Sequence, residues 1–242
     1  MMQSLEQETV GVLGGMGPLA SAGFVRTIYS AYRGQVEQES PIVLLYSNPK
    51  VGDRTATFLE GGDHLEMLAE LESGLRHLVA QGATQLVICC ITAHYLLPEL
   101  PQDLREKVVS LIDVIFEELR GTEKACLLAC STGTRRLGLF QQHPAWGGAQ
   151  HRICLPTDDE QQKLHEAIYV LKRDQKPGQL IKVLLSICHA HGVDTLIAGC
   201  TELHLLSKAC AGPNALNQKI EIIDPLAAIA TRYSEEFCVA QI

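Results

Sequence analysis

The sequence predicts an α/β fold of two similar lobes, each a parallel sheet flanked by helices. Short apolar runs rich in β-branched residues alternate along the chain with amphipathic stretches. The segment 81–96, QGATQLVICCITAHYL, aligns without a gap on the segment 191–206, HGVDTLIAGCTELHLL, which places Cys90 on Cys200. The 242 residues suffice for two lobes of roughly 100 residues, each with its own core. We therefore expect two halves related by a pseudo-twofold axis, with a site in the cleft between them.

The first half is expected to begin with a buried strand at residues 9–13. The glycine turn GGMGP follows this strand, and its proline suits the first turn of an amphipathic helix at 20–33. The apolar run 42–46 predicts the next strand, and apolar residues at three- and four-residue spacing predict a helix over 64–80. A further apolar run predicts a third strand at 86–89. Because strands alternate with helices, the sheet should be parallel and covered on both faces.

The second half repeats the pattern. Strands are expected at 125–128, 153–155 and 196–198, and amphipathic helices at 161–173 and 180–191. The short strands are uniformly apolar, as in sheets that are buried on both faces.

A further strand at 220–223 and a helix up to residue 237 follow the second half of the repeat. We expect this C-terminal segment to cross back and pack on the first half. The predicted first lobe therefore comprises residues 1–117 and 213–242, and the predicted second lobe comprises residues 118–212.

Composition and charge exclude several classes of protein. Hydrophobic residues make up 46% of the chain and charged residues 20%, which is typical of globular proteins. The net charge is −8 and no stretch gathers five or six basic residues, so we expect no nucleic-acid partner. The N-terminus lacks the pattern of a secretory signal, and no apolar run reaches the roughly 18 residues of a membrane span. Nine cysteines, an odd number, favour a reducing compartment and predict a cytoplasmic location.

Cys90 and Cys200 each stand at the end of an expected strand and the start of a helical segment. Loops at the carboxyl ends of parallel strands build binding sites, so two related halves would bring both thiols to one pocket. A helix N-terminus lowers the pKa of a thiol from about 8.5 towards neutrality, and a thiolate and a thiol can then act as base and acid. Such a pair suits racemisation, in which one side removes the α-proton of an amino acid and the other returns a proton. Both cysteines could instead be small buried apolar residues.

Four motifs occur in the order GGMGP at 14–18, NPKVGDRT at 48–55, CITAH at 90–94 and GCTE at 199–202. Together they resemble the motifs of the cofactor-independent aspartate/glutamate racemase superfamily, and they are most similar to its aspartate racemase branch. The chain also resembles stand-alone aspartate racemases of nonribosomal-peptide pathways such as microcystin synthesis. The resemblance spans nearly the whole chain. It implies interconversion of L- and D-aspartate by two-base proton transfer, without pyridoxal phosphate or a metal, in a homodimer.

Carried over residue by residue, the resemblance implies that Cys90 and Cys200 are the catalytic acid/bases. It implies that Arg54 grips a substrate carboxylate, for which a planar guanidinium is suited. The other residues that it implies in substrate binding lie in the glycine turn or carry polar groups: Met16, Thr92, Ser131, Thr134, Thr201 and a cation that is either Lys172 or Arg173.

One departure and several alternatives stay open. Members of the superfamily usually carry asparagine directly after the first cysteine, where this chain has Ile91, which cannot donate a hydrogen bond. The loss of one such donor to a charged group is worth about 1.5 to 3 kcal/mol, so substrate affinity and preference are open. A racemase of glutamate or another acidic amino acid, a decarboxylase that needs one thiol, and a non-catalytic binding protein for an acidic metabolite are the alternatives. The glycine turn matches a dinucleotide pattern only weakly, and Cys188, His189 and His191 lack the spacing of a zinc site.

Overall fold

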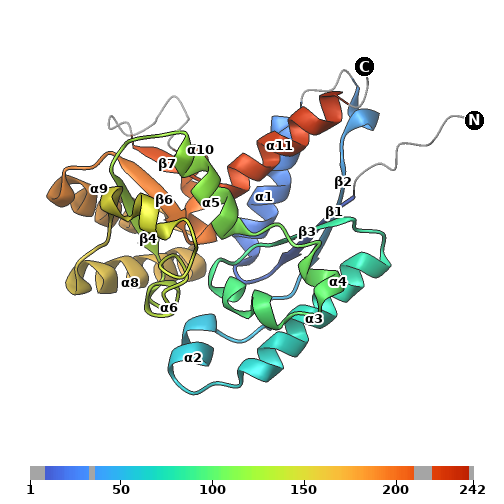
Figure 1. The fold of residues 1–242 in the computed structure, drawn as a ribbon, viewed down its shortest axis with the longest axis horizontal. Coiled ribbons are helices and arrows are strands. Elements are labelled where there is room, and N and C mark those ends of the chain that lie inside the picture. Colours follow the sequence, from blue (N-terminus) through green and yellow to red (C-terminus); the bar gives the residue numbers. More distant parts are fainter. Residues whose placement is uncertain (1–8, 33–35, 210–219, 240–242) are drawn as a thin grey trace, which may run out of the picture.

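The computed structural model describes residues 9–32, 36–209 and 220–239, which form two α/β lobes (Figure 1). The first lobe has a parallel sheet of strand order β2-β1-β3, and the second has a parallel sheet of order β5-β4-β6-β7. The predicted α/β fold with two parallel sheets is therefore confirmed. The strands are β1 (Thr9–Gly14), β2 (Ile42–Ser47), β3 (Gln85–Ile88), β4 (Cys126–Cys130), β5 (Ile153–Cys154), β6 (Thr195–Gly199) and β7 (Glu221–Ile223).

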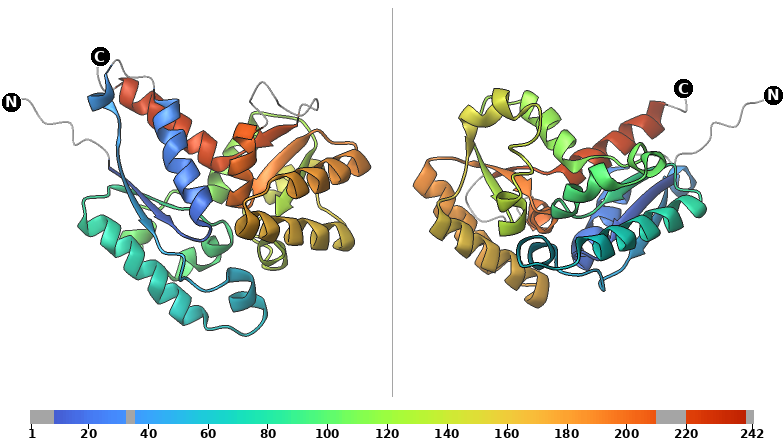
Figure 2. Two further views of the ribbon diagram at one scale, coloured as in Figure 1. Left: turned by 180° about the vertical axis from the view of Figure 1, so that it is seen from behind. Right: turned by 60° about the horizontal axis from the view of Figure 1, so that its bottom comes forward.

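Helices cover both faces of the sheets (Figures 1 and 2). The helix expected at 20–33 is present, and its final residue, Arg33, lies outside the described residues. The helix after β5 begins with a capping box between Thr157 and Glu160, which satisfies main-chain N–H groups of its first turn. The helices are α1 (Pro18–Ala31), α2 (Arg54–Leu59), α3 (His64–Ala80), α4 (Gln102–Arg105), α5 (Leu111–Arg120), α6 (Thr132–Arg136), α7 (Trp146–Ala149), α8 (Asp158–Asp174), α9 (Gly178–His191), α10 (His204–Ala209) and α11 (Pro225–Val239).

The two halves repeat one topology. In each half the first strand lies between the second and the third, and a cysteine follows the third strand within two residues. Val108 makes an isolated parallel bridge with Leu86 of β3, at the position that β7 occupies beside β6. The next helix along the chain is α5 in the first half and α11 in the second.

The C-terminal segment divides between the two lobes, and this corrects one expectation. Strand β7 pairs with β6, so it belongs to the second sheet and not to the first lobe. The edge of β6 that β4 leaves free offers main-chain partners to Ile222 and Ile223, which accounts for this position. Only α11 crosses back, and it packs on α1 and α5. Residues 213–219 and 240–242, which were assigned to the first lobe, lie outside the described residues.

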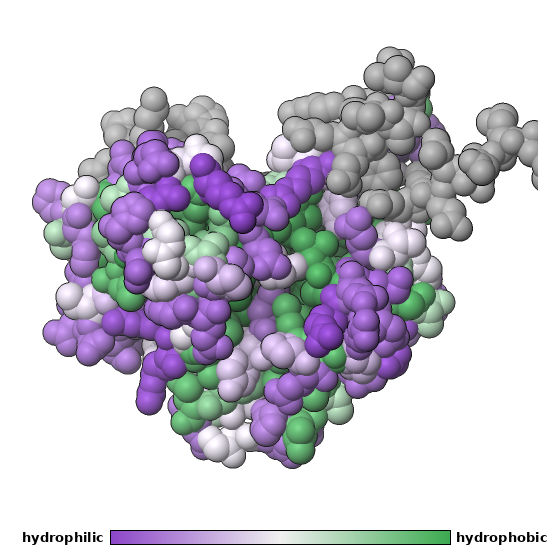
Figure 3. Space-filling view, in the orientation of Figure 1, coloured by the Kyte–Doolittle hydropathy of each residue, from purple (hydrophilic) through white to green (hydrophobic). Residues whose placement is uncertain are grey.

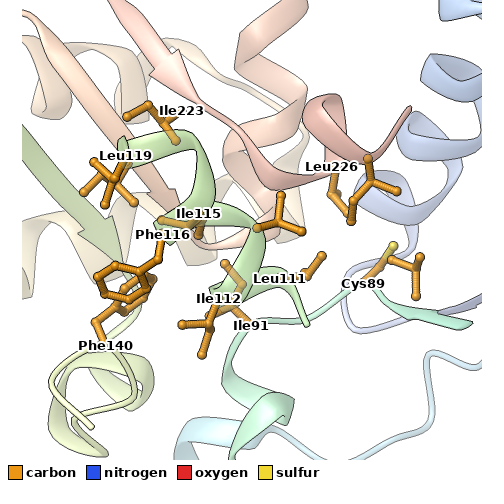
Figure 4. Packing of buried hydrophobic residues seen from close by; sticks show 14 of the residues in the cluster. Cys89, Ile91, Leu111, Ile112, Ile115, Phe116, Leu119, Phe140, Ile223 and Leu226 are labelled. Atoms are coloured by element: carbon orange, nitrogen blue, oxygen red, sulfur yellow. The ribbon is translucent and has the colours of Figure 1, made fainter. Parts of the chain in front are cut away.

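A hydrophobic core shared by both lobes joins them (Figure 4). The apolar face of α5 contributes Ile115, Phe116 and Leu119, which lie in one buried cluster with Phe140 and Ile223 of the second half. From the first half, α1 contributes buried apolar side chains to the same cluster. Burial of this kind stabilises a fold by about 25 cal/mol per Å² of apolar surface, so the shared core fixes the lobes as one structure.

Each lobe also has a core of its own. One cluster lies between α3 and the first sheet, and another lies between α8, α9 and the second sheet. The face drawn in Figure 3 is mainly polar, and apolar side chains show in the hollow between the lobes. In the part of the chain that the structure describes, no helix is both long enough and apolar enough to span a membrane.

Candidate active site

Cys90 and Cys200 line the same pocket between the lobes. Each follows the third strand of its half, at the carboxyl end of a parallel sheet, and each is more than nine-tenths buried. The chain then turns at once into a 3₁₀ helix, Thr92–Glu99 in the first half and Thr201–Leu203 in the second. The helical segments expected after the thiols are therefore present, as 3₁₀ helices. The other lining residues are Arg54, Thr55, Ile91, Thr92, Ser131, Tyr169, Lys172, Thr201 and Glu202.

Arg54 lies on the Cys90 side of the pocket. It is the first residue of α2, and its buried guanidinium donates hydrogen bonds to the carbonyl oxygens of Gly52 at 2.7 Å and Met16 at 2.9 Å. Burial opposes its charge, but Cys90 and then Asp53 raise the pKa of Arg54 above its usual value. A fixed cation beside a thiol interacts favourably with the thiolate form.

The Cys200 side of the pocket has the opposite electrostatic character. The Cys200 thiol donates a hydrogen bond to Glu202 Oε2, with Sγ and Oε2 2.8 Å apart. Burial, and next the negative charge of Glu202, raise the pKa of Cys200 well above its usual value. Lys172 Nζ lies 3.6 Å from Glu202 Oε1 and 4.9 Å from the centre of the Tyr169 ring. Burial opposes the charge of Lys172, but Glu202 and Cys200 raise its pKa.

Three hydroxyl groups form a cluster across the lobes. Thr92 Oγ1 is 2.8 Å from Thr134 Oγ1 and 3.2 Å from Ser131 Oγ. Ser131 also caps α6 by accepting a hydrogen bond from the Thr134 N–H. In the second half, Thr201 donates a hydrogen bond to the carbonyl oxygen of Cys89 in the first. Threonine hydroxyls beside both thiols thus link the halves at the pocket.

Three residues implied in substrate binding lie elsewhere. Arg173 points to solvent and pairs with Asp174 at 2.7 Å, because it is one step round α8 from Lys172, the cation that lines the pocket. The side chain of Met16 is buried in the core of the first lobe, and its carbonyl oxygen holds Arg54. Thr134 lies behind Thr92 and does not line the pocket.

Thr55, Tyr169 and Glu202 also line the pocket, although the resemblance does not imply them in substrate binding. A signal for Tyr169 was available, since it precedes Lys172 by three residues and shares one face of the helix with it. Thr55 follows Arg54 directly, and Glu202 follows Cys200 by two residues. Among the described residues, no group of three or more His, Cys, Asp or Glu side chains could hold a metal ion, and His191 pairs instead with Glu160.

The glycine turn brings β1 and α1 close to the rest of the pocket. Gly15 has a φ of +99°, and a Cβ there would lie 2.3 Å from the main chain of Asn48. A side chain cannot fit such an approach, so glycine is required at this position. The turn places the Met16 carbonyl against Arg54 and so fixes that side chain from the rear.

The pocket is almost closed. Its cavity measures about 10 Å³, which is room for about one water molecule. Tyr169 of the second lobe closes one side, where its hydroxyl donates a hydrogen bond to Asp53 Oδ2 at 2.7 Å and lies 3.2 Å from Thr55 Oγ1. Burial raises the pKa of Tyr169 to about 12, so the hydroxyl remains a donor at neutral pH. Entry of an amino acid therefore requires the lobes to separate at this contact.

Replacing Tyr169 with Phe should expose the pocket thiols more often. Loss of the hydrogen bond to Asp53 costs the closed state about 1 kcal/mol, which increases the open population about fivefold. The rates at which iodoacetamide alkylates Cys90 and Cys200, followed by mass spectrometry at fixed pH, should rise by this factor. Tyr29→Phe, at an exposed tyrosine of α1, is the matched control. Equal rates in Tyr169→Phe and the control would show that this contact does not hold the pocket closed.

The fold and the pocket define the class to which the protein belongs. Its members have two similar α/β lobes, and each lobe contributes one cysteine to a common site. The chain belongs to the Asp/Glu/hydantoin racemase family, whose model matches residues 13–233.

Solved structures of racemases share the fold. An aspartate racemase from Picrophilus torridus superposes with a TM-score of 0.77 at 20% sequence identity, over 97% of this chain and 100% of that one. A glutamate racemase from Francisella tularensis in complex with D-glutamate gives 0.64 at 11% identity, over 98% of this chain and 83% of that one. An allantoin racemase from Klebsiella pneumoniae gives 0.55 at 12% identity, over 97% and 89%. At these identities the likeness concerns the fold.

Proposed function

We propose that this protein is a cofactor-independent racemase that interconverts L- and D-aspartate. The observation that carries the proposal is the pocket itself: Cys90 and Cys200, from equivalent places of the repeat, line it together with the cations Arg54 and Lys172. Two cations suit a substrate with two carboxylates, and two thiols suit proton transfer at both faces of its α-carbon.

The proton transfer takes place between the two sulfur atoms and the α-carbon. In one direction, the Cys90 thiolate removes the α-proton and becomes a thiol, while the Cys200 thiol gives its proton to the opposite face of the same carbon. The C–H bond that breaks is replaced by a new C–H bond of inverted configuration, and the reverse reaction exchanges the two roles.

The surrounding residues hold the substrate and stabilise the carbanion. Hydrogen bonds to Gly52 and Met16 fix the guanidinium of Arg54, so that it meets one carboxylate without reorganisation. Lys172 serves the second carboxylate, and Thr92 stands beside Cys90 to donate to the α-carboxylate. Thr201 can donate to the same group once its hydroxyl leaves the Cys89 carbonyl. A closed pocket excludes water, which strengthens these interactions and keeps the abstracted proton from solvent. Neither pyridoxal phosphate nor a metal takes part in this scheme.

Ile91 gives the pocket wall beside Cys90 an apolar character. Aspartate and glutamate carry the same polar groups and differ by one methylene, so the polarity of this wall does not distinguish them; the resemblance of the motifs at 14–18 and 199–202 to those of aspartate racemases supports aspartate as the substrate. By resemblance to its family, we further propose that the protein acts as a homodimer in the cytoplasm. Size-exclusion chromatography with light scattering tests the dimer, and a mass of one chain would refute it.

The test of the function is isotope exchange. Purified protein without added cofactor should exchange the α-hydrogen of both L- and D-aspartate in heavy water, measured by NMR, and should invert the configuration of each. Glutamate, tested in parallel, should react more slowly; a faster reaction would make the protein a glutamate racemase. Aspartate binding without any exchange would refute the racemase and support a non-catalytic binding protein. Loss of carbon dioxide that requires only one of the two cysteines would support a decarboxylase.

A further inference from the structure

Glu202 is a buried carboxylate that takes no part in the substrate contacts proposed above. The residue is 2% exposed, and it lies in the 3₁₀ helix that follows Cys200. Oε2 accepts the hydrogen bond of the Cys200 thiol at 2.8 Å, whereas Oε1 has no hydrogen-bond partner in the structure. A buried carboxylate oxygen that accepts no hydrogen bond is costly, so its retention at this place calls for a function.

Positive charge compensates Glu202 from two sides. Lys172 Nζ of α8 lies 3.6 Å from Oε1. The N-terminus of α1 meets the same oxygen, because a Cβ on Gly17, the N-cap residue, would lie only 2.5 Å from Oε1. No side chain caps this helix, and a helix N-terminus carries partial positive charge. Both contacts hold the carboxyl group in place beside the Cys200 thiol.

The two thiols consequently have opposite neighbours. A cation, Arg54, acts on Cys90, whereas the carboxylate of Glu202 accepts a hydrogen bond from the Cys200 thiol. The charged or titratable groups that line the pocket with Cys200 are Glu202, Lys172 and Tyr169 on its own side and Arg54 and Cys90 across the pocket. If Cys200 lost its proton, a thiolate would lie in contact with the carboxylate of Glu202, and two like charges in a buried site repel strongly.

We propose that Glu202 is a positioning residue that holds the proton of Cys200, so that the resting protein carries a thiol at Cys200. This inference rests on the proposed function, since it describes the resting state of the two-base reaction. The hydrogen bond also fixes the rotamer of Cys200 and therefore the line along which its sulfur meets the α-carbon.

The proposal predicts in which kinetic quantity the effect appears. L- and D-aspartate have equal free energies, so kcat/KM must be the same for both enantiomers in every variant. Asymmetry between the thiols therefore cannot favour one enantiomer in kcat/KM. It appears in the pH profile, whose alkaline limb reports loss of the proton from the thiol that acts as acid. Glu202 disfavours that loss, so it moves the alkaline limb to higher pH.

The first experiment compares the protein with its Glu202→Gln variant, which keeps the size of the side chain and removes its charge. The alkaline limb of kcat/KM should move to lower pH by about one unit or more, by the same amount for both enantiomers. Gly17→Ala is a second route to the same result, because its new Cβ pushes Oε1 away while Glu202 keeps its charge. Glu166→Gln, at an exposed position of α8, is the control and should leave the limb in place.

The second experiment does not depend on catalysis. In a Cys90→Ala background, where Cys200 titrates without its partner thiol, the alkylation rate of Cys200 by iodoacetamide is measured against pH by mass spectrometry. Adding Glu202→Gln should lower the midpoint by about one unit, and adding Gly17→Ala should shift it in the same direction. A midpoint that stays in place or rises in either folded variant overturns the proposal. If the alkylation midpoints fall but the protein exchanges the α-hydrogen of neither aspartate nor glutamate, the proposed racemase activity is refuted and the role of Glu202 stands. If the protein racemises aspartate but the midpoints do not move, only the role of Glu202 is refuted.

Discussion

Replacing Cys90 or Cys200 with Ala should abolish racemisation of aspartate. Each thiol supplies general acid or base catalysis on one face of the α-carbon, and such a contribution is worth about 10² to 10⁴ in rate. Neither thiol can replace the other, because they come from different lobes of the protein and each reaches only one face of the α-carbon. Polarimetry or chiral chromatography of aspartate, started from each enantiomer, measures the loss.

The two cysteine variants should differ from one another in isotope exchange. The thiol that remains can still remove the α-proton from its own face and return a solvent deuteron there. Residual exchange is therefore expected for one enantiomer in Cys90→Ala and for the other enantiomer in Cys200→Ala. Cys130→Ala, at a buried cysteine of β4 outside the pocket, is the control for loss of a thiol. Racemisation that survives in either pocket variant would refute the two-base mechanism.

Replacing Arg54 with Lys should lower kcat/KM for aspartate about a hundredfold. A lysine keeps the charge but loses the planar fork that reaches the carbonyl oxygens of Gly52 and Met16 and a carboxylate at the same time. Loss of charge-assisted hydrogen bonds in a buried site costs about 3 kcal/mol, which corresponds to this factor. Steady-state kinetics with both enantiomers should give the same loss.

Arg173→Lys is the matched control for Arg54→Lys. The resemblance allowed Arg173 as a substrate cation, but the structure places it in solvent beside Asp174. Replacing Arg173 should therefore leave kcat/KM unchanged. A large loss in Arg173→Lys together with normal activity in Arg54→Lys would overturn the assignment of the substrate cations.

Much of this fold could be predicted from the chain because β1, β4 and β6 are buried along their whole length, whereas the edge strand β2 is largely exposed. Uniformly apolar runs such as those of β1, β4 and β6 allow hardly any other interpretation, and the internal repeat placed both cysteines after equivalent strands. The part of the site that lies at strand ends could be predicted too, because a residue that directly follows a parallel strand must lie at the carboxyl edge of the sheet.

Other features depend on contacts that no local pattern encodes. The position of β7 beside β6 was not predictable, since a strand of only three residues carries no pattern that selects one sheet edge over another. Lys172 and Arg173 are adjacent, and only the rotation of α8 against the pocket decides which of them lines it. Met16 acts through its carbonyl oxygen, so its side chain gave no indication of its contact with Arg54.

The packing of helices α5 and α11 suggests how the two halves of the chain arose. Each is the last helix of its half, and each packs on the opposite half: α5 in the cluster with Phe140 and Ile223, and α11 on α1. A half-length ancestor would have exposed the apolar surface that this helix covers, unless two copies exchanged their final helices. Such an exchange is a common route to symmetric dimers. Gene duplication and fusion of a swapped dimer would give the arrangement seen here, with one thiol inherited from each copy.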